Sequence, residues 1–165
     1  MLGHFGFSYV GLLYMLMMVL PNILWARRQP EGYDSSGENK VLQVFERIGQ
    51  VLCTVALLLF SDYNPRSIEP WTVWLFLSAA LMVLYEVFWI RYFRSKRTVA
   101  DFYRGLWGIP APGATLPVTA FLLLGIYGKV IWLIGASIIF GVGHVGIHLQ
   151  HMRKLNKSKG ASSSF

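Results

Sequence analysis

Three histidines near the C-terminal end of the sequence are spaced so that one side of a helix would carry them all. His144, His148 and His151 stand at positions i, i+4 and i+7, and a turn of about 100° per residue places them in one stripe. Histidine can give or take a proton near pH 7. The stripe therefore predicts acid–base chemistry, or hydrogen bonds that fix one helix against its neighbours.

Metal binding is a further interpretation of this stripe. Histidines one helical turn apart, such as His144 and His148, can share a metal ion. The sequence has one other histidine, His4, near the opposite terminus, so a metal would also need Glu46 or Glu86 as a ligand. We assign no metal on this basis, and the sequence identifies no cofactor.

A second polar stripe lies in the first third of the sequence. On a helix its members fall within an arc of about 100°, and they are Gln43, Glu46, Arg47, Gln50 and Thr54. Ionisable groups are expensive in hydrocarbon and normally face the interior of a bundle. Glu46 and Arg47, with Glu86, could equally form an ion network that only fixes helix packing.

Five apolar stretches would position these residues. They cover residues 5–25, 38–60, 71–90, 109–127 and 130–151, and each approaches the length of about 20 residues that crosses a bilayer. Runs such as 51–60 and 75–84 lack the polar side that a soluble helix needs. We therefore expect an all-α integral membrane protein with five transmembrane helices, forming one domain over residues 1–152.

The basic residues alternate between the predicted loops. Segments 26–40, 91–108 and 152–165 carry three, five and four Lys and Arg, whereas the N-terminus, loop 61–70 and turn 128–129 carry none, one and one. Cytoplasmic loops are enriched in Lys and Arg. This split predicts an N-terminus outside and a C-terminus in the cytoplasm, in a plasma or inner membrane.

The predicted cytoplasmic segments have features of their own. Ser35 to Glu38 fit a capping box for the second helix. Residues 98–107 predict a short amphipathic helix in the membrane interface, with Thr98 as its N-cap. The tail, residues 153–165, is basic, and we expect it to be disordered.

Basic side chains before this interfacial helix predict contacts with anionic lipid headgroups. They are Arg91, Arg94, Lys96 and Arg97. The net charge of +7 fits this role better than nucleic-acid binding, because the basic residues flank span ends.

The fourth span begins irregularly. Residues 109–117 contain three prolines and a glycine, and proline inside a helix removes a hydrogen bond. Two interpretations remain open at this point, a loop with a late helix start or a broken helix. Irregular backbone at membrane depth is tolerated where protein or a water-filled cavity covers it.

The predicted topology brings the polar groups of several helices to one level near the cytoplasmic face. We expect them to line a pocket there, and the candidates are Asn22, Glu46, Arg47, Gln50, Glu86, His144 and His148. Of these, His144, His148, Glu46 and Glu86 could carry acid–base catalysis.

Three classes of function fit such a pocket. The favoured hypothesis is binding of an amphiphile or small ligand, with or without His/Glu acid–base chemistry. The alternatives are a small oligomeric transporter or proton-coupled carrier, because five spans make a thin wall for a pathway, and a structural or regulatory membrane subunit. A homo-oligomer fits the second class in particular.

Overall fold

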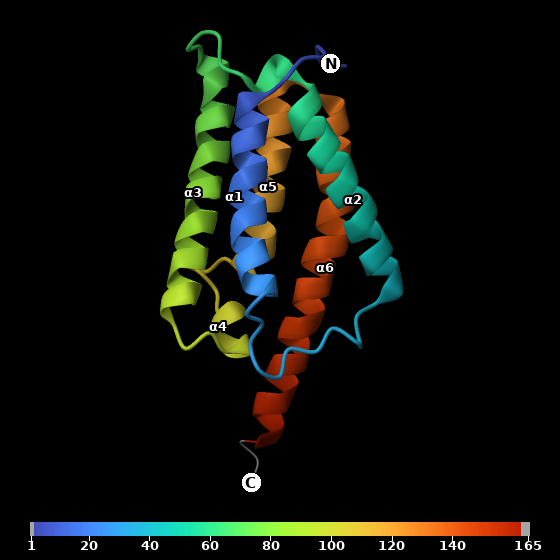
Figure 1. The fold of residues 1–165 in the computed structure, drawn as a ribbon, viewed down its shortest axis with the longest axis vertical. Helices are drawn as coiled ribbons and strands as arrows, with labels where there is room; N and C mark the ends of the chain where they lie inside the picture. Colours follow the sequence, from blue (N-terminus) through green and yellow to red (C-terminus); the bar gives the residue numbers. More distant parts are fainter. Residues whose placement is uncertain (1, 163–165) are drawn as a thin grey trace.

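The structure is a computed structural model that describes residues 2–162, and these residues form a bundle of helices (Figure 1). The helices are α1 (Tyr9–Ala26), α2 (Lys40–Leu59), α3 (Val73–Arg94), α4 (Val99–Phe102), α5 (Pro112–Gly128) and α6 (Ile131–Ser162), with 3-10 turns at Ser61–Tyr63 and Pro70–Thr72. The described residues contain two isolated bridges, Phe5 with Phe60 and Leu106 with Ile109, and no strand. The predicted all-helical class is confirmed.

Four stretches are long and apolar enough to cross a membrane, which supports a multi-pass membrane protein. They are Tyr9–Ala26, Lys40–Leu59, Pro70–Arg94 and Ile131–Lys157. Helix α5 is also apolar but has 17 residues, or about 25 Å of helix, against a hydrocarbon core of about 30 Å.

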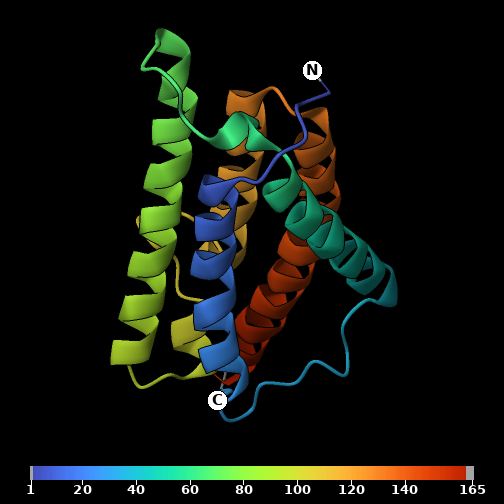
Figure 2. The ribbon, with the colours of Figure 1, turned by 45° about the horizontal axis from the view of Figure 1, so that its top comes forward.

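Helix α5 lies in the middle of the bundle, behind α1 and between α3 and α6 (Figures 1 and 2). Its side chains Leu116, Phe121 and Leu124 are fully or almost fully buried. The hydroxyl of Ser78 in α3 donates to the carbonyl of Ala120 at 2.7 Å, which ties the two helices together. Other helices of the chain thus surround α5 on several sides, although α5 is short for a membrane span.

Helices α2 and α6 cross at two glycines. A side chain on Gly143 of α6 would overlap the backbone of Glu46, and one on Gly49 of α2 would overlap the backbone of Phe140. Glycine permits such close approach because it has no Cβ. The crossing therefore holds the polar stripes of the two helices side by side.

Helix α1 touches α2 at one end and leaves it at the other. Gly11 lies directly against the backbone of Leu57, near the end of the bundle that carries the N-terminus (Figure 1). Toward the opposite end the two helices diverge in both ribbon views (Figures 1 and 2). The divergence leaves room between α1 and α2 for a cavity.

The predicted interfacial helix is shorter than expected. Thr98 is its N-cap, as predicted, and forms a reciprocal capping box with Asp101. The helix ends at Phe102 because Tyr103, its C-cap, leaves the helical conformation, and the chain turns again at Trp107 and Gly108, both of which have positive φ. Phe102 and Tyr103 are buried in the core, so the apolar side predicted to face lipid packs against protein instead.

Two other predicted helix ends also differ. The N-cap of α2 is Asn39, whose side chain accepts from the amides of Val41 and Leu42; the predicted capping box at Ser35 and Glu38 is wrong. Helix α6 continues to Ser162, although disorder was predicted from residue 153. The stretch contains no proline that would end the helix.

The proline-rich segment is a loop followed by a late helix start. Ala111, in the left-handed conformation, precedes Pro112, the first residue of α5. Proline is well suited to the first turn of a helix. Pro117 lies inside α5 and is buried, as are Pro112 and Ala114 at its start, so the helix begins within the bundle.

Candidate functional site

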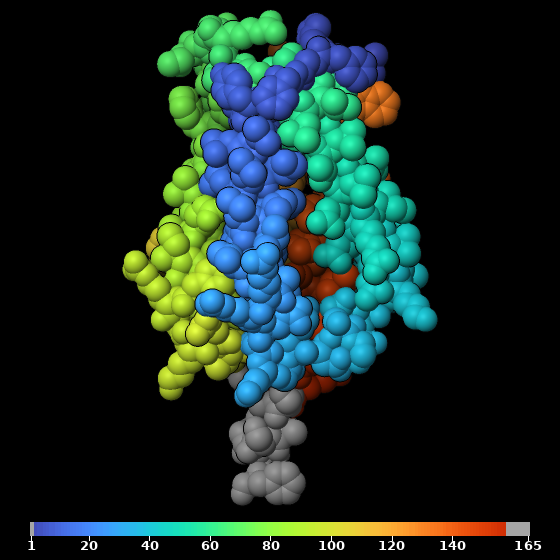
Figure 3. Space-filling model, viewed as in Figure 1, coloured from blue at the N-terminus to red at the C-terminus, as the bar shows by residue number. Residues whose placement is uncertain are grey.

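A cavity of about 270 Å³ lies where α1 and α2 diverge. Five helices contribute to its lining, which consists of Met18, Val19, Asn22, Ile23, Ala26, Glu46, Gln50, Tyr85, Pro117, Phe140 and His144. The space-filling view shows the surface hollowed between α1 and α2, with atoms of α6 at the bottom of the hollow (Figure 3). The cavity therefore opens sideways, toward the side of the bundle that lipid would cover.

Glu46 and His144 form the polar centre of this cavity. Nδ1 of His144 lies 2.5 Å from Oε1 of Glu46, and the side chains are 19% and 26% exposed. The ring of His144 stacks on Phe140 with the centroids 4.8 Å apart. A carboxylate that accepts from Nδ1–H leaves Nε2 as a hydrogen-bond acceptor, and among the described residues Nε2 has no partner.

A second polar contact crosses the cavity from α1 to α3. The amide nitrogen of Asn22 donates to the hydroxyl of Tyr85 at 2.7 Å and to the carbonyl of Met18 at the same distance. Asn22 lies directly after Pro21, which is inside α1. The contact thus holds α1 against α3 on the wall opposite Glu46 and Gln50.

His148 lies one turn further along α6 and does not reach the cavity lining. Its ring contacts those of His144, Phe102 and Tyr103, with centroids 4.7, 5.7 and 5.6 Å away. No side-chain hydrogen bond of His148 occurs among the described residues. His148 thus extends the series of contacting rings from His144 in the cavity to Phe102 and Tyr103 at the end of α4.

His151 takes part in a second histidine–carboxylate pair. Its Nε2 lies 2.9 Å from Oε1 of Glu38, and both side chains are about nine-tenths buried. The imidazole is sandwiched between the rings of Tyr33 and Tyr103 at centroid distances of 5.3 and 5.7 Å. Because His151 lies next to the basic tail, its position in the sequence predicts a side chain at the membrane interface, whereas the structure buries it.

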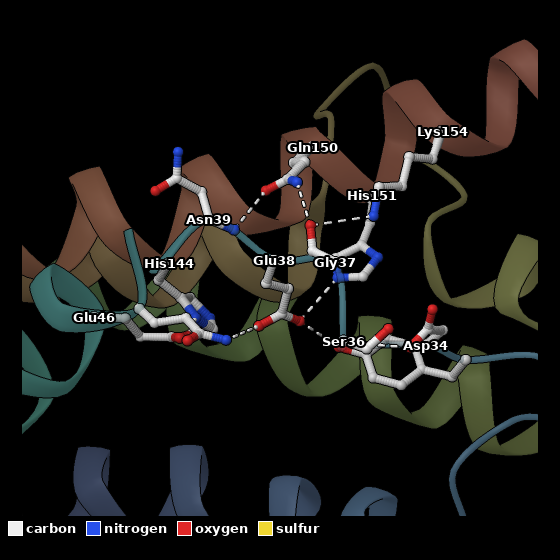
Figure 4. A network of polar contacts seen from close by, with 12 residues as sticks. Asp34, Ser36, Gly37, Glu38, Asn39, Glu46, His144, Gln150, His151 and Lys154 are labelled. Carbon is white, nitrogen blue, oxygen red and sulfur yellow. Dashed lines mark hydrogen bonds and ion pairs between the residues drawn. The ribbon is translucent and has the colours of Figure 1, made fainter. Parts of the chain in front are cut away.

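The loop between α1 and α2 is attached to α6 around this second pair (Figure 4). The side-chain oxygen of Gln150 accepts from the amide of Asn39, and its nitrogen donates to the carbonyl of Gly37. Glu38 also accepts from Gln43, through its second oxygen, at 3.0 Å. This network holds the loop against the C-terminal half of α6.

The two tyrosines beside His151 titrate well above their ordinary range. Burial, followed by the charge of Glu38, raises the pKa of Tyr33 to about 12. Burial, followed by the nearby Tyr33, likewise raises the pKa of Tyr103. Both phenols therefore stay neutral at physiological pH.

Arg47 and Glu86 do not take part in the histidine–carboxylate pairs. Arg47 is exposed and forms no ion pair among the described residues, where the ion pairs join His4 to Asp62, His144 to Glu46 and His151 to Glu38. Glu86 is half-buried, and its Oε1 has no hydrogen-bond partner. The predicted network of Glu46, Arg47 and Glu86 is therefore not formed.

The described His, Cys, Asp and Glu side chains do not gather closely enough to coordinate a metal ion. Among the described residues, no group of three or more His, Cys, Asp or Glu could hold a metal ion. His144 and His148 face different partners, because His144 is bonded to Glu46 while His148 lies among aromatic rings.

Of the residues predicted to bind lipid headgroups, Arg91 has protein partners. Its guanidinium donates to the carbonyls of Gly105 and Arg104 at 2.8 and 2.6 Å, which ties the end of α3 to the segment after α4. Arg94, Lys96 and Arg97 are exposed.

Several residues of the site were missed from the sequence. The sequence predicts a helix cap at Glu38, and Tyr33 and Tyr85 carry no periodic pattern that would assign them to the site. The glycines at the α2–α6 crossing offered a signal, since small residues on inward stripes permit close packing. Another glycine of α6, Gly141, does not belong to this crossing, because it lies against Val118 of α5.

Comparisons of the chain with protein-family models, with curated proteins and with solved structures found no match. The candidate function therefore rests on the residues of the cavity and on their contacts.

Proposed function

We propose that the chain crosses a plasma or inner membrane five times, with its N-terminus outside and its C-terminus in the cytoplasm. The end of α1, the start of α2, the end of α3 and α4 lie at one end of the bundle (Figure 1), and 12 of the 15 Lys and Arg belong to the segments at that end. An excess of basic residues is typical of the cytoplasmic side. Helix α5 is the fourth of these spans in chain order and brings their number to five, and it is buried among the others.

A reporter enzyme that works only outside the cell tests this topology. Fused after Phe165 it should be inactive, and inserted after Arg66 it should be active, because these positions lie on opposite sides of the proposed membrane. A reporter active at the end of the chain but not in the loop would reverse the orientation. Activity at both positions would contradict an odd number of spans.

We further propose that the protein binds an amphiphile with an uncharged hydroxyl headgroup, which enters sideways from the membrane. The observation that carries this proposal is the cavity between α1 and α2, whose partly apolar lining includes the polar pair of Glu46 and His144. At about 30 Å³ per water molecule, the cavity accommodates a small headgroup and the first carbons of a chain. The rest of the chain would extend through the opening between the helices.

The chemistry of the lining favours a hydroxyl over a phosphate. Glu46 offers carboxylate oxygens, Gln50 an amide oxygen and His144 its Nε2. The lining contains one carboxylate and no Lys or Arg, so a phosphate would meet like charge and no counter-charge. A hydroxyl can donate to Nε2 of His144, which is the geometry in which this histidine would also act as a general base.

A proton-coupled carrier is the second candidate. The observation that favours it is the succession of His144, His148 and His151 along α6, with carboxylates at both ends of the stripe. Such a succession can relay protons. A carrier would acidify the lumen of proteoliposomes when an inward proton gradient is imposed, whereas a binding protein would not.

Photolabelling with a monoacylglycerol that carries a diazirine in its chain tests the amphiphile proposal. The protein is placed in nanodiscs of neutral phospholipid, and we expect the label on Val19, Ile23 or Pro117. His144→Ala should lower the affinity about tenfold, because one hydrogen bond of about 1.5 kcal/mol is lost.

His4→Ala is the matched control for that experiment. It removes a histidine from another histidine–carboxylate pair, His4 with Asp62, which does not belong to the cavity lining, and should leave labelling unchanged. Labelling spread evenly over exposed residues such as Leu13 and Val51, or undiminished in His144→Ala, would show that the cavity does not bind the probe.

A further inference from the structure

A groove of about 500 Å³ lies between α2 and α6 on a different side from the cavity. On α6 its lining centres on residues 146 to 157, while the cavity uses residues 140 and 144. At 100° per residue the two sets point in directions roughly 130° apart. The contact of α2 with Gly143 separates them.

One half of the groove is strongly basic. Arg153, Lys154 and Lys157 line it within about one turn of α6, and the rest of the lining includes two amide side chains and no carboxylate. Lys154 is held in place, since its Nζ lies 3.3 Å from the carbonyl of Gly37. Three cations without a carboxylate among them attract an anion.

The other half of the groove is apolar. Leu42 of α2 and Leu149 of α6 line it, and Gly146 leaves the space between them open. A Cβ on Gly146 would first meet the side-chain carbons of Leu42, at 3.1 Å. The apolar half belongs to the stretch that is apolar enough to cross a membrane, and Lys157 is the last residue of that stretch.

The arrangement of charge beside apolar surface matches one molecule of anionic phospholipid. We propose that its phosphate binds to Arg153, Lys154 and Lys157 and that an acyl chain lies against Leu42, Gly146 and Leu149. Long basic side chains at the end of a span reach the phosphate level of a bilayer. The apolar half distinguishes a lipid from a free phosphate compound, which would gain nothing from it.

This site is separate from the proposed amphiphile site in position and in chemistry. The cavity offers hydrogen-bond acceptors and no Lys or Arg, whereas the groove offers cations and no carboxylate. A phospholipid in the groove contacts α2 and α6 together, and so stabilises the pairing on which the distance between Glu46 and His144 depends.

Native mass spectrometry of the detergent-purified protein tests the proposal, with equal amounts of phosphatidylglycerol and phosphatidylcholine as probes. We expect one molecule of phosphatidylglycerol to be retained in preference to phosphatidylcholine. The triple variant Arg153→Gln, Lys154→Gln, Lys157→Gln should bind it about 100-fold more weakly, at about fivefold per lost charge.

The matched control removes three exposed charges at the same end of the bundle that do not line the groove. Arg27→Gln, Arg28→Gln, Arg104→Gln should keep the full affinity, and equal losses in the two triple variants would show general charge attraction and overturn the proposal. Leu149→Trp fills the apolar half and keeps every charge. It should also weaken binding, and it provides an independent result if the triple variant does not fold.

Two further measurements exclude the other occupants of the groove. Glycerol phosphate, a headgroup without chains, should not displace the lipid; if it competes at similar concentration, the ligand is a soluble phosphate and the lipid assignment is wrong. A dimer that disappears in Leu149→Trp without any change in lipid retention would show that a second copy of the chain covers the groove.

Discussion

Gly143→Ala should lower the free energy of unfolding by about 3 kcal/mol or more. A Cβ at this position would overlap the backbone of Glu46 and lie 2.6 Å from the carbonyl oxygen of Leu42. Backbone atoms cannot rotate away as a side chain can, so α2 and α6 must separate. The loss can be measured by denaturant titration of the protein in micelles.

Gly135→Ala is the matched control, because it makes the same substitution in the same helix. A Cβ on Gly135 has no atom within 4 Å, and alanine favours helix over glycine by about 1 kcal/mol. This variant should be as stable as the parent or slightly more stable. If Gly143→Ala were equally stable, the close crossing of α2 and α6 would not exist in solution.

The crossing also decides the geometry of the cavity, which a second measurement detects. Gln50 and His144 both line the cavity, so cysteines at these positions should be joined by a short cross-linker in the parent background. In Gly143→Ala the yield should fall, because the clash moves α6 away from α2.

Much of the fold follows from the sequence because a bilayer imposes a length and a composition on each span. The apolar runs that predicted spans 38–60 and 71–90 coincide with α2 and α3 to within a few residues. Regular helical rotation predicts that Glu46, Gln50 and His144 lie on the inward sides of their helices, and all three line the cavity, although Gln50 is also exposed. That these residues share one cavity can therefore be predicted without knowing any long-range contact.

The pairs that depend on loops and on helix crossings could not be predicted in this way. The contact of Glu38 with His151 joins residues 113 positions apart, through a loop whose path no helical period describes. Arg47 lies next to Glu46 in the sequence, but one residue is a 100° rotation, which is enough to leave it exposed. For residues 98–107 the apolar spacing identified buried side chains, whereas the end of the helix at Phe102 leaves no mark on that spacing.

The pair of Glu46 and His144 should account for a large share of the stability of the bundle. Both side chains are about three-quarters or more buried and lie 2.5 Å apart, inside a bundle that membrane lipid would surround. Removing one partner of a buried pair leaves the other uncompensated and costs about 3 to 5 kcal/mol. His144→Ala should therefore destabilise the protein by about 3 kcal/mol, although it removes no more than one ring.

The double variant Glu46→Gln, His144→Ala distinguishes loss of the pair from loss of packing. Glutamine has nearly the same shape as glutamate and no charge, so the double variant should recover at least about 1.5 kcal/mol of the loss seen in His144→Ala. His4→Ala breaks a pair whose histidine is 82% exposed, and it should cost less than about 1 kcal/mol. Strictly additive effects of the two substitutions in α2 and α6 would mean that Glu46 and His144 act independently. In that case the histidine would stabilise the bundle through its stacking on Phe140, and the carboxylate would not control which nitrogen of His144 carries the proton.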